Sequence, residues 1–327
     1  MKILYSVQAT GNGHISRAHE LFPYLCQLGE VDIMLSGSNA TLKMDMPVKY
    51  RSQGMSLFYS QCGGLDYKKT WSAFNYSKIR RDISNLPVEK YDLVINDFDY
   101  VTSRACARKK VPSVQFGHQA SFMSPKAPRP TSKSLIGEFI LKNYAPATHY
   151  VGLHFDKYDK FVFPPIVKDC FIQANPQNHG HITVYLPAYQ TDCIEKILKE
   201  ISPVEVHWFL PDIKKPTKID NITYFPVNQQ YFNESLIHCH GLLTGGGFET
   251  PAEALYLGKN LLTIPIDGQY EQQCNSAALE KIGIDKIGFL NEKNKSTFIN
   301  WVFQKQTVKK IKANDINETL DYLLNLH

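Results

Sequence analysis

The sequence lacks several features that would assign it to a whole class of proteins. None of its apolar runs approaches the ~20 residues that a helix needs to cross a bilayer. Its seven cysteines are odd in number and contain no CxxC pair, which argues against a disulfide framework and for free thiols in a reducing compartment. A net charge of +5 is too mild to indicate a nucleic-acid partner.

Motifs of several common ligand sites are missing as well. No lysine follows the glycines at 245–247, which excludes the P-loop of nucleoside triphosphatases. The glycine loop at 11–13 has Ser16 in place of the third glycine of a dinucleotide fingerprint, and the next strand ends without a ribose-binding carboxylate. Cys239 lies between two histidines, but no second ligand group follows at zinc spacing. We therefore expect no metal and no nicotinamide or flavin cofactor.

Strand-like and helical runs alternate along the chain, which predicts an α/β fold with mostly parallel sheets. Expected strands lie at residues 3–7, 31–35, 91–95, 113–116, 149–153, 182–186, 204–210, 222–225, 241–244 and 260–265. Expected helices lie at 15–28, 99–109, 134–143, 193–201, 233–239, 250–258, 295–304 and 316–324. A proline-bearing connector at 163–167 and a polar stretch at 175–180 separate the two halves. We expect two domains, residues 1–165 and 166–327.

The most informative stretch is residues 241–278, which begins with a glycine-rich turn between a strand and a helix. The glycines at 245–247 form the turn, and the helix is expected to start at Thr250. The first amides of such a helix have no partners and carry the positive end of the peptide dipoles, so backbone groups at 246–250 would hold a diphosphate. Glu253 would then face a ribose. Alternatively, Thr250 and Glu253 form a capping box.

A second polar cluster follows the expected strand at 260–265. Residues 267–272 read Asp-Gly-Gln-Tyr-Glu-Gln. A carboxylate and a carboxamide at the carboxyl end of a strand can bind adjacent sugar hydroxyls, which assigns Glu271 and Gln272 to a sugar. The alternative for this pair is a solvated helix start.

At these residues the chain resembles the GT-B glycosyltransferases, in particular the UDP-glycosyltransferases and the N-acetylglucosaminyltransferase of peptidoglycan synthesis. Their donor pattern, T-x-G-G-x-x-[ST]-x-x-E followed by a strand ending in proline and [DE]-Q-x-x-N, corresponds here to Thr244, Gly246, Gly247, Thr250, Glu253, Pro265, Glu271, Gln272 and Asn275. Many relatives carry histidine or arginine where Gly245 stands, so that phosphate contact must come from elsewhere. The donor-binding residues that the resemblance implies are Thr244, Gly245, Gly246, Gly247, Phe248, Glu249, Thr250, Glu253, Gln269, Glu271 and Gln272. It also implies two facing Rossmann-like domains with a deep interdomain cleft, and a last helix that packs back on the first domain.

The amino-terminal half contributes a second candidate site. Gly11, Asn12 and Gly13 form a loop that delivers His14 to the carboxyl edge of the first sheet, where an imidazole can take a proton from an acceptor hydroxyl. The structural alternative is a helix cap or a packed ring. The resemblance favours His14 as the base, with Asp97 as the carboxylate that orients it. Asp99 is the alternative partner, and Asp97 could instead cap the next helix.

Residues 117–119, Gly-His-Gln, resemble an H-x-Q element that lies near the acceptor or the phosphates in the peptidoglycan enzyme. His118 is therefore a second base candidate. Gln119 joins residues 11–13 as a possible contact to the acceptor or the phosphates.

Together these residues predict an inverting, metal-independent glycosyltransferase that moves a sugar from a nucleotide-diphosphate sugar, by analogy a UDP-sugar, to a hydroxyl acceptor. A UDP-sugar 2-epimerase or hydrolase on the same scaffold is one alternative, and a non-catalytic sensor of sugar nucleotides is another. Cations interleave with aromatics at 68–81, which indicates either a lipid-facing segment that would suit a lipid-linked acceptor or a helix with a solvated basic face. We expect a cytoplasmic protein, with the inner face of the membrane as the site of any such contact.

Overall fold

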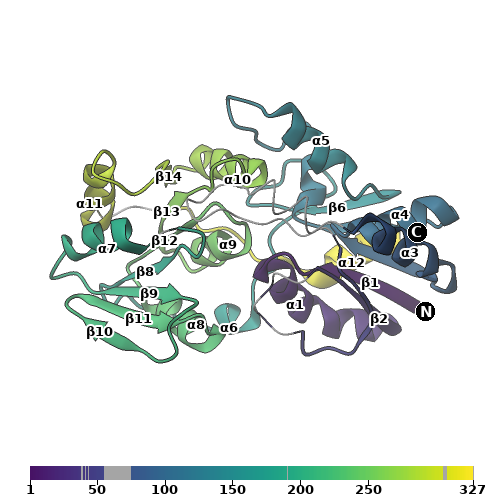
Figure 1. The fold of residues 1–327 in the computed structure, drawn as a ribbon, viewed down its shortest axis with the longest axis horizontal. Coiled ribbons are helices and arrows are strands. Elements are labelled where there is room, and N and C mark those ends of the chain that lie inside the picture. Colours follow the sequence, from purple (N-terminus) through teal and green to yellow (C-terminus); the bar gives the residue numbers. More distant parts are fainter. Residues whose placement is uncertain are drawn as a thin grey trace.

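Two seven-stranded sheets, each flanked by helices, lie side by side in the molecule (Figure 1). The computed structural model describes residues 1–37, 40, 42, 44–54, 75–189, 191–304 and 308–326. The first sheet has the order β3 (Val48–Ser52), β2 (Glu30–Ser36), β1 (Lys2–Gln8), β4 (Leu93–Asp97), β5 (Val114–Gly117), β6 (His149–Leu153) and β7 (Val162–Phe163). The second has the order β10 (Thr217–Ile219), β11 (Ile222–Pro226), β9 (Val206–Leu210), β8 (Ile182–Tyr185), β12 (Gly241–Gly245), β13 (Asn260–Ile264) and β14 (Asp285–Lys286).

The helices connect these strands. Those associated with the first sheet are α1 (Asn12–Leu28), α3 (Tyr76–Asn85), η1 (Val88–Lys90), α4 (Tyr100–Lys109), η2 (Gln119–Met123) and α5 (Leu135–Asn143). Those that follow are α6 (Asp169–Ile172), α7 (Thr191–Lys199), α8 (Gln229–His238), α9 (Glu249–Tyr256), α10 (Tyr270–Lys281), α11 (Lys295–Phe303) and α12 (Ile316–Leu324).

Both sheets are parallel apart from the β10–β11 pair. Parallel strands need helical crossovers, which cover both faces of the sheet, and β1 shows this because its consecutive residues Leu4 and Tyr5 are both fully buried. The prediction of an α/β fold with mostly parallel sheets is therefore confirmed.

Each sheet has one point where the strand order reverses direction. In the first sheet β1 lies between β2 and β4, and in the second β8 lies between β9 and β12. Connections leave such a point toward opposite faces of the sheet, which opens a crevice at the carboxyl ends of the two strands. The expected functional turns follow β1 and β12, so both lie at these crevices.

Several elements differ from the expectations. The strands β3, β7, β10 and β14 were not expected, because they are short and all four lie at sheet edges. Helix α1 begins at Asn12 and α9 at Glu249, each earlier than the pattern predicted. Of the basic aromatic stretch at 68–81, residues 68–74 lie outside the described part of the chain, and the rest enters α3, which buries Ile79 and exposes its basic side chains.

We call the part of the molecule built around the first sheet the first lobe, and the part built around the second sheet the second lobe. The last helix packs against the first lobe. Helix α12 contacts α1, and its Tyr322 ring lies 5.2 Å from that of Phe163 (Figure 1). The backbone N–H of Asn314 donates to Pro165 O at 2.9 Å. The C-terminal segment therefore ties the second lobe back to the first near residue 165, while the domain boundary itself stays a prediction.

Candidate active site

His14 and Asp97 meet at the carboxyl edge of the first sheet. His14 lies in the first turn of α1 and Asp97 is the last residue of β4, and β1 and β4 are neighbouring parallel strands. The Nδ1 atom of His14 is 3.0 Å from Asp97 Oδ1. Asp97 is fully buried, whereas the His14 side chain remains 13% exposed. The Asp97 carboxylate therefore holds the ring through Nδ1, and Nε2 is the ring nitrogen that a substrate could reach.

Arg17 completes this cluster, and the sequence analysis missed it. Its Nη2 donates to both oxygens of Asp97, at 2.7 and 2.9 Å, and lies 3.0 Å from His14 Nδ1. Its Nη1 donates to Glu249 in the first turn of α9. Spacing alone offered a signal, because Arg17 follows His14 by three residues and therefore lies on the same face of α1. The guanidinium joins the two lobes through one buried carboxylate and one at the cleft.

The charges around His14 act in opposite directions on its pKa. Burial lowers the pKa, but the Asp97 carboxylate and its hydrogen bond raise it, and they outweigh both burial and the repulsion from Arg17, so the pKa of His14 is raised above 6.5. Burial also works to raise the pKa of Asp97, yet Arg17 and His14 hold that pKa below its ordinary value. Asp97 is therefore an anion at neutral pH, as a carboxylate that orients a catalytic histidine must be.

The glycine turn after β12 is braced by α10. The Oε1 atom of Gln272 accepts from the backbone N–H groups of Gly246 and Ile266, at 3.1 and 3.0 Å, and Asn275 Nδ2 donates to Gly246 O at 3.1 Å. A Cβ at Gly246 would lie 2.8 Å from the carbonyl oxygen of Gln272, so only glycine fits. The Gly246 amide donates to Gln272 in this structure, so the phosphate contact expected there stays a prediction.

The capping box expected at Thr250 and Glu253 is not formed. The cap residue of α9 is Phe248, which makes no side-chain cap, so Thr250 already lies within the helix. Glu253 is 3% exposed and forms an ion pair with Lys168 at 2.8 Å. Burial raises the pKa of Glu253, and Lys168 opposes that rise. Lys168 follows the connector between the lobes and had no local sequence signal.

His118 is buried at the contact between β6 and α10, and its role as a base stays a prediction. It is 1% exposed, one ring nitrogen lies 2.9 Å from Leu153 O, and the other lies 2.7 Å from Asn275 Oδ1. Its ring stacks on Phe248 at 3.9 Å, and burial lowers its pKa. Both nitrogens are engaged, so the geometry favours His14 over His118 as the base.

The remaining expected residues are divided between packing and the space between the lobes. Thr244 donates to Tyr185 O at 3.0 Å within the sheet, and Asn12 Oδ1 accepts from Leu42 N at 3.1 Å. Gln119 Nε2 donates to Glu271 Oε1 across the lobes at 3.1 Å. The Oε1 atoms of Gln119 and Gln269 are buried without a hydrogen-bond partner in the described structure, so both can still accept from a ligand.

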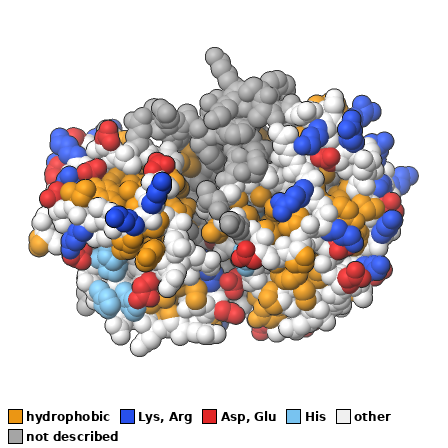
Figure 2. Space-filling view, turned by 60° about the horizontal axis from the view of Figure 1, so that its bottom comes forward, with side chains coloured by type: hydrophobic (Ala, Val, Ile, Leu, Met, Phe, Trp, Pro, Cys, Tyr) orange, Lys and Arg blue, Asp and Glu red, His pale blue; other side chains and the backbone are white. Residues whose placement is uncertain are grey.

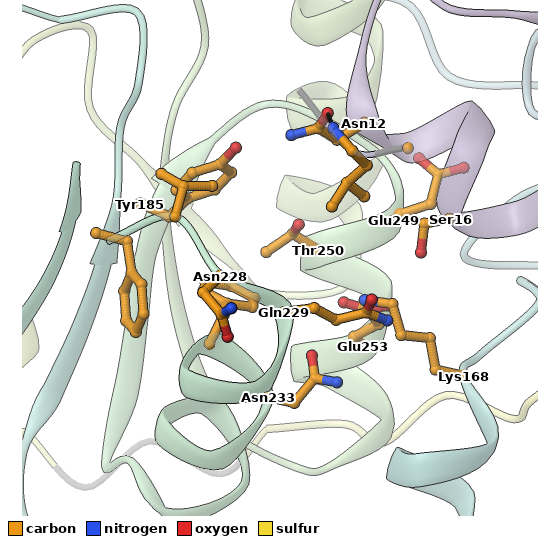
Figure 3. A pocket seen from close by; sticks show the side chains of 15 residues that line it. Asn12, Ser16, Lys168, Tyr185, Asn228, Gln229, Asn233, Glu249, Thr250 and Glu253 are labelled. Carbon is orange, nitrogen blue, oxygen red and sulfur yellow. Dashed lines mark hydrogen bonds and ion pairs between the residues drawn. The ribbon is translucent and has the colours of Figure 1, made fainter. Parts of the chain in front are cut away.

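A pocket of about 570 Å³ opens between the lobes beside this cluster (Figure 3). Helix α1 contributes Asn12, Gly13 and Ser16, α9 contributes Glu249, Thr250 and Glu253, and α8 and the strand ends of the second sheet form the opposite wall. Other lining residues are Leu42, Lys168, Tyr185, Phe209, Val227, Asn228, Gln229, Phe232 and Asn233. Gly13 permits this approach of the lobes, since a Cβ there would lie 2.6 Å from Glu249 Oε2.

Metal ligands do not gather in the described part of the chain. Among those residues, no group of three or more His, Cys, Asp or Glu could hold a metal ion. Asp97 and Asp99 have D-x-D spacing, but Asp99 caps α4 through Val101 N and Thr102 N while Asp97 binds Arg17. Histidines gather on one face of the second lobe (Figure 2). Among the described histidines, His179 stacks on His238 and His181 on His207. Cys239 is buried and donates to Leu236 O.

Comparison with known families decides the assignment. The sequence profile of glycosyl transferase family 1 matches residues 1–303. The chain belongs to this family. No curated protein matches the sequence of this glycosyltransferase. Within the described residues, its helices include none that is both long and apolar enough to cross a membrane.

Solved structures confirm the GT-B fold of this glycosyltransferase. UGT89C1 from Arabidopsis thaliana, complexed with UDP, is 12% identical, with a TM-score of 0.62 over 99% of this chain and 98% of that chain. MurG from Acinetobacter baumannii is 14% identical, with a TM-score of 0.57 over 99% of both chains. SnogD from Streptomyces nogalater, also 14% identical, has a TM-score of 0.53 over 100% of this chain and 99% of that chain.

Proposed function

We propose that this glycosyltransferase moves a sugar from a nucleotide-diphosphate sugar to a hydroxyl acceptor by one inverting displacement, without a metal ion. The observation that carries the proposal is the pairing of His14 with Asp97 at 3.0 Å, next to a pocket that Gly13 and the first turn of α9 line together. A base held at the mouth of an anion-binding helix start is what such a displacement needs. UDP is the first donor nucleotide to test, because a structural neighbour is complexed with it.

The pocket has two chemically different ends, which suit the parts of a nucleotide. Tyr185, Phe209 and Phe232 supply aromatic surface for a base, and the rings of Phe209 and Phe232 lie 5.1 Å apart. The start of α9 presents backbone amides and a positive dipole end for the diphosphate. Glu253 lies one turn further along α9, beside Lys168 and Gln229 (Figure 3), where its carboxylate can accept from ribose hydroxyls if Lys168 releases it or binds it at the same time.

Proton transfer in the proposed step runs through His14. Because Asp97 is ionised, Nδ1 carries the proton and donates to it, and Nε2 keeps a lone pair. The acceptor oxygen transfers its proton to Nε2 and attacks the anomeric carbon as the bond to the diphosphate oxygen breaks. The nucleoside diphosphate leaves with the bonding electron pair. One displacement inverts the anomeric configuration, and Asp97 stabilises the imidazolium that forms.

A protein carboxylate already lies at the helix start where the diphosphate would bind. The Glu249 carboxylate lies in the first turn of α9 and is bound by Arg17. Two anions cannot share that helix start, so we propose that the donor displaces Glu249. Arg17 then remains beside the site as a buried cation close to the departing diphosphate, which supports a metal-independent step.

Donor binding is the first test of this function. In a thermal-shift and mass-spectrometric screen against nucleotide sugars, one class of donor should raise the unfolding temperature, because ligands that bind only the native state stabilise it. NMR of the product then reports the anomeric configuration, and a chelator should leave the rate unchanged. Retention of configuration or a requirement for a divalent ion would contradict the proposal. Rapid conversion of the donor without acceptor would instead support an epimerase or a hydrolase.

A further inference from the structure

Helix α5 exposes more apolar surface than any other described element of its length. Leu135 is 86% exposed, Ile136 73%, Phe139 67% and Ile140 46%. Positions i, i+1, i+4 and i+5 share one face of a helix, so these four side chains form a continuous patch. The other exposed large hydrophobic residues of the described chain are spread over separate elements: Met1, Tyr76, Ile172, Ile219, Tyr231 and Phe303. We call the four residues of α5 the apolar face.

Gly137, Glu138 and Leu141 of α5 face the other way, into the protein. Glu138 is bound by Arg129 and accepts from the Tyr270 hydroxyl at 2.9 Å. A Cβ at Gly137 would collide with the Tyr270 ring, at 2.4 Å, so the backbone of α5 lies directly on the start of α10. The inward side of α5 is therefore anchored, and the apolar face is exposed. The helix itself lies at the outer edge of the molecule (Figure 1).

The segment of chain that carries the apolar face is rich in cations. Residues 124–143 contain four cations, Lys126, Arg129, Lys133 and Lys142, and one acid, Glu138, which is already neutralised. The side chains of Lys126, Lys133 and Lys142 are exposed. Aliphatic and aromatic side chains flanked by lysines match a lipid interface with anionic headgroups. A second copy of the chain fits less well, because a symmetric contact would bring the two sets of lysines together.

We propose that the apolar face of α5 docks this glycosyltransferase on an anionic lipid surface. Tyr270, which contacts α5, starts the helix that also carries Glu271, and Glu271 meets Gln119 across the lobes. Docking through α5 therefore brings a membrane to the rim of the cleft. This docking depends only on the exposed helix and its charges, so a failure to bind vesicles would not contradict the proposed transfer reaction.

Vesicle binding tests the proposal directly. The full chain should sediment with vesicles of phosphatidylcholine and phosphatidylglycerol, and less with phosphatidylcholine alone or at high salt. The double variant Ile136→Glu, Phe139→Glu should bind at least about tenfold more weakly, since both apolar groups and the electrostatic attraction are lost. Phe303→Glu is the matched control, because Phe303 is 61% exposed on a different helix, and it should bind like the native chain.

A spectroscopic variant separates insertion from mere adhesion. In Phe139→Trp the added indole should shift its emission to shorter wavelength with anionic vesicles and be quenched by brominated lipid, whereas Phe303→Trp should show neither effect. Equal sedimentation of the double variant and the control would overturn the proposal. A change in oligomeric state of the double variant without vesicle binding by the native chain would also overturn it, in favour of a second copy as the occupant.

Discussion

The two lobes each place a glycine-bearing turn between a central parallel strand and a helix, and they use it differently. After β1, the turn leads into α1 and presents side chains, because His14 and Arg17 project from the helix onto Asp97. After β12, the turn is itself held by side chains, since Gln272 and Asn275 bind Gly246 on both its N–H and its carbonyl. Similar backbone paths thus deliver a reactive side chain in one lobe and a rigid helix start in the other.

This difference predicts two kinds of variant. Changes in the first turn should affect turnover and its pH dependence while donor binding is kept. Changes around the second turn should affect donor binding and stability while the pKa of His14 is kept. Variants in the two turns therefore test whether turnover and donor binding are separate, and the largest effect is expected at His14.

His14→Ala should lower the turnover number about 10²- to 10⁴-fold, since a positioned general base contributes that much. The dissociation constant of the donor should change little, because the ring lies outside the donor pocket. Steady-state kinetics and calorimetric titration measure the two quantities. His19→Ala on the same helix is the control and should keep its activity. A large loss of donor affinity in His14→Ala would contradict the separation of the two turns.

Asp97→Asn should lower turnover about 10²-fold or more, because the imidazolium loses its counter-charge. The base works only as neutral imidazole, so kcat/KM falls as pH drops through the His14 pKa, which the native chain holds above 6.5. Without the Asp97 charge that pKa falls, and the acidic limb of the profile should move to lower pH.

Asp99→Asn is the matched control for that pH profile. Asp99 caps α4 and binds Ser6 Oγ at 2.9 Å, away from His14. Asparagine can still cap the helix, but its NH2 group cannot accept from Ser6 Oγ or Thr102 N, so the substitution should reduce stability by about 1 kcal/mol and leave the acidic limb where it was. An equal shift of the limb in both variants would mean that Asp97 is not the specific partner of His14.

Asn275→Ala should lower the free energy of unfolding by about 1–3 kcal/mol, because Gly246 O and the Nε2 atom of His118 both lose the side chain that binds them. A looser glycine turn should also weaken donor binding. Chemical denaturation and calorimetric titration measure the two effects, and Gln273→Ala on the same helix is the control. Unchanged donor affinity in a folded Asn275→Ala protein would show that the brace serves stability alone.

Glu253→Gln should weaken donor binding about tenfold if the carboxylate accepts from ribose hydroxyls. It also leaves Lys168 without its anion, which lowers stability by itself. The double variant Lys168→Met, Glu253→Gln removes both charges and should recover stability but not affinity. Recovery of both would assign Glu253 to the ion pair only, as a double-mutant cycle of unfolding and binding energies would reveal.

Regular alternation and glycine chemistry were enough to predict the α/β fold, the central strands of both sheets and the turns that follow β1 and β12. Around the second turn, the same local signals did not predict which contacts the side chains make. Thr250 and Glu253 match a capping box in spacing, but Lys168, which is distant in sequence, binds Glu253 instead. Gln272 matches a sugar-binding motif, but in this structure its oxygen binds Gly246 and Ile266.

The sequence by itself determined which strands could be buried, which segments would be helical around the central strands, and that His14 would stand at the edge of a parallel sheet, because these depend on local periodicity and on residues close in the chain. Only the tertiary structure decided that Arg17 lies between Asp97 and Glu249, that His118 is locked by Leu153 and Asn275, and that α5 keeps its apolar face outside. Those outcomes depend on contacts between distant segments, whose geometry local sequence does not encode.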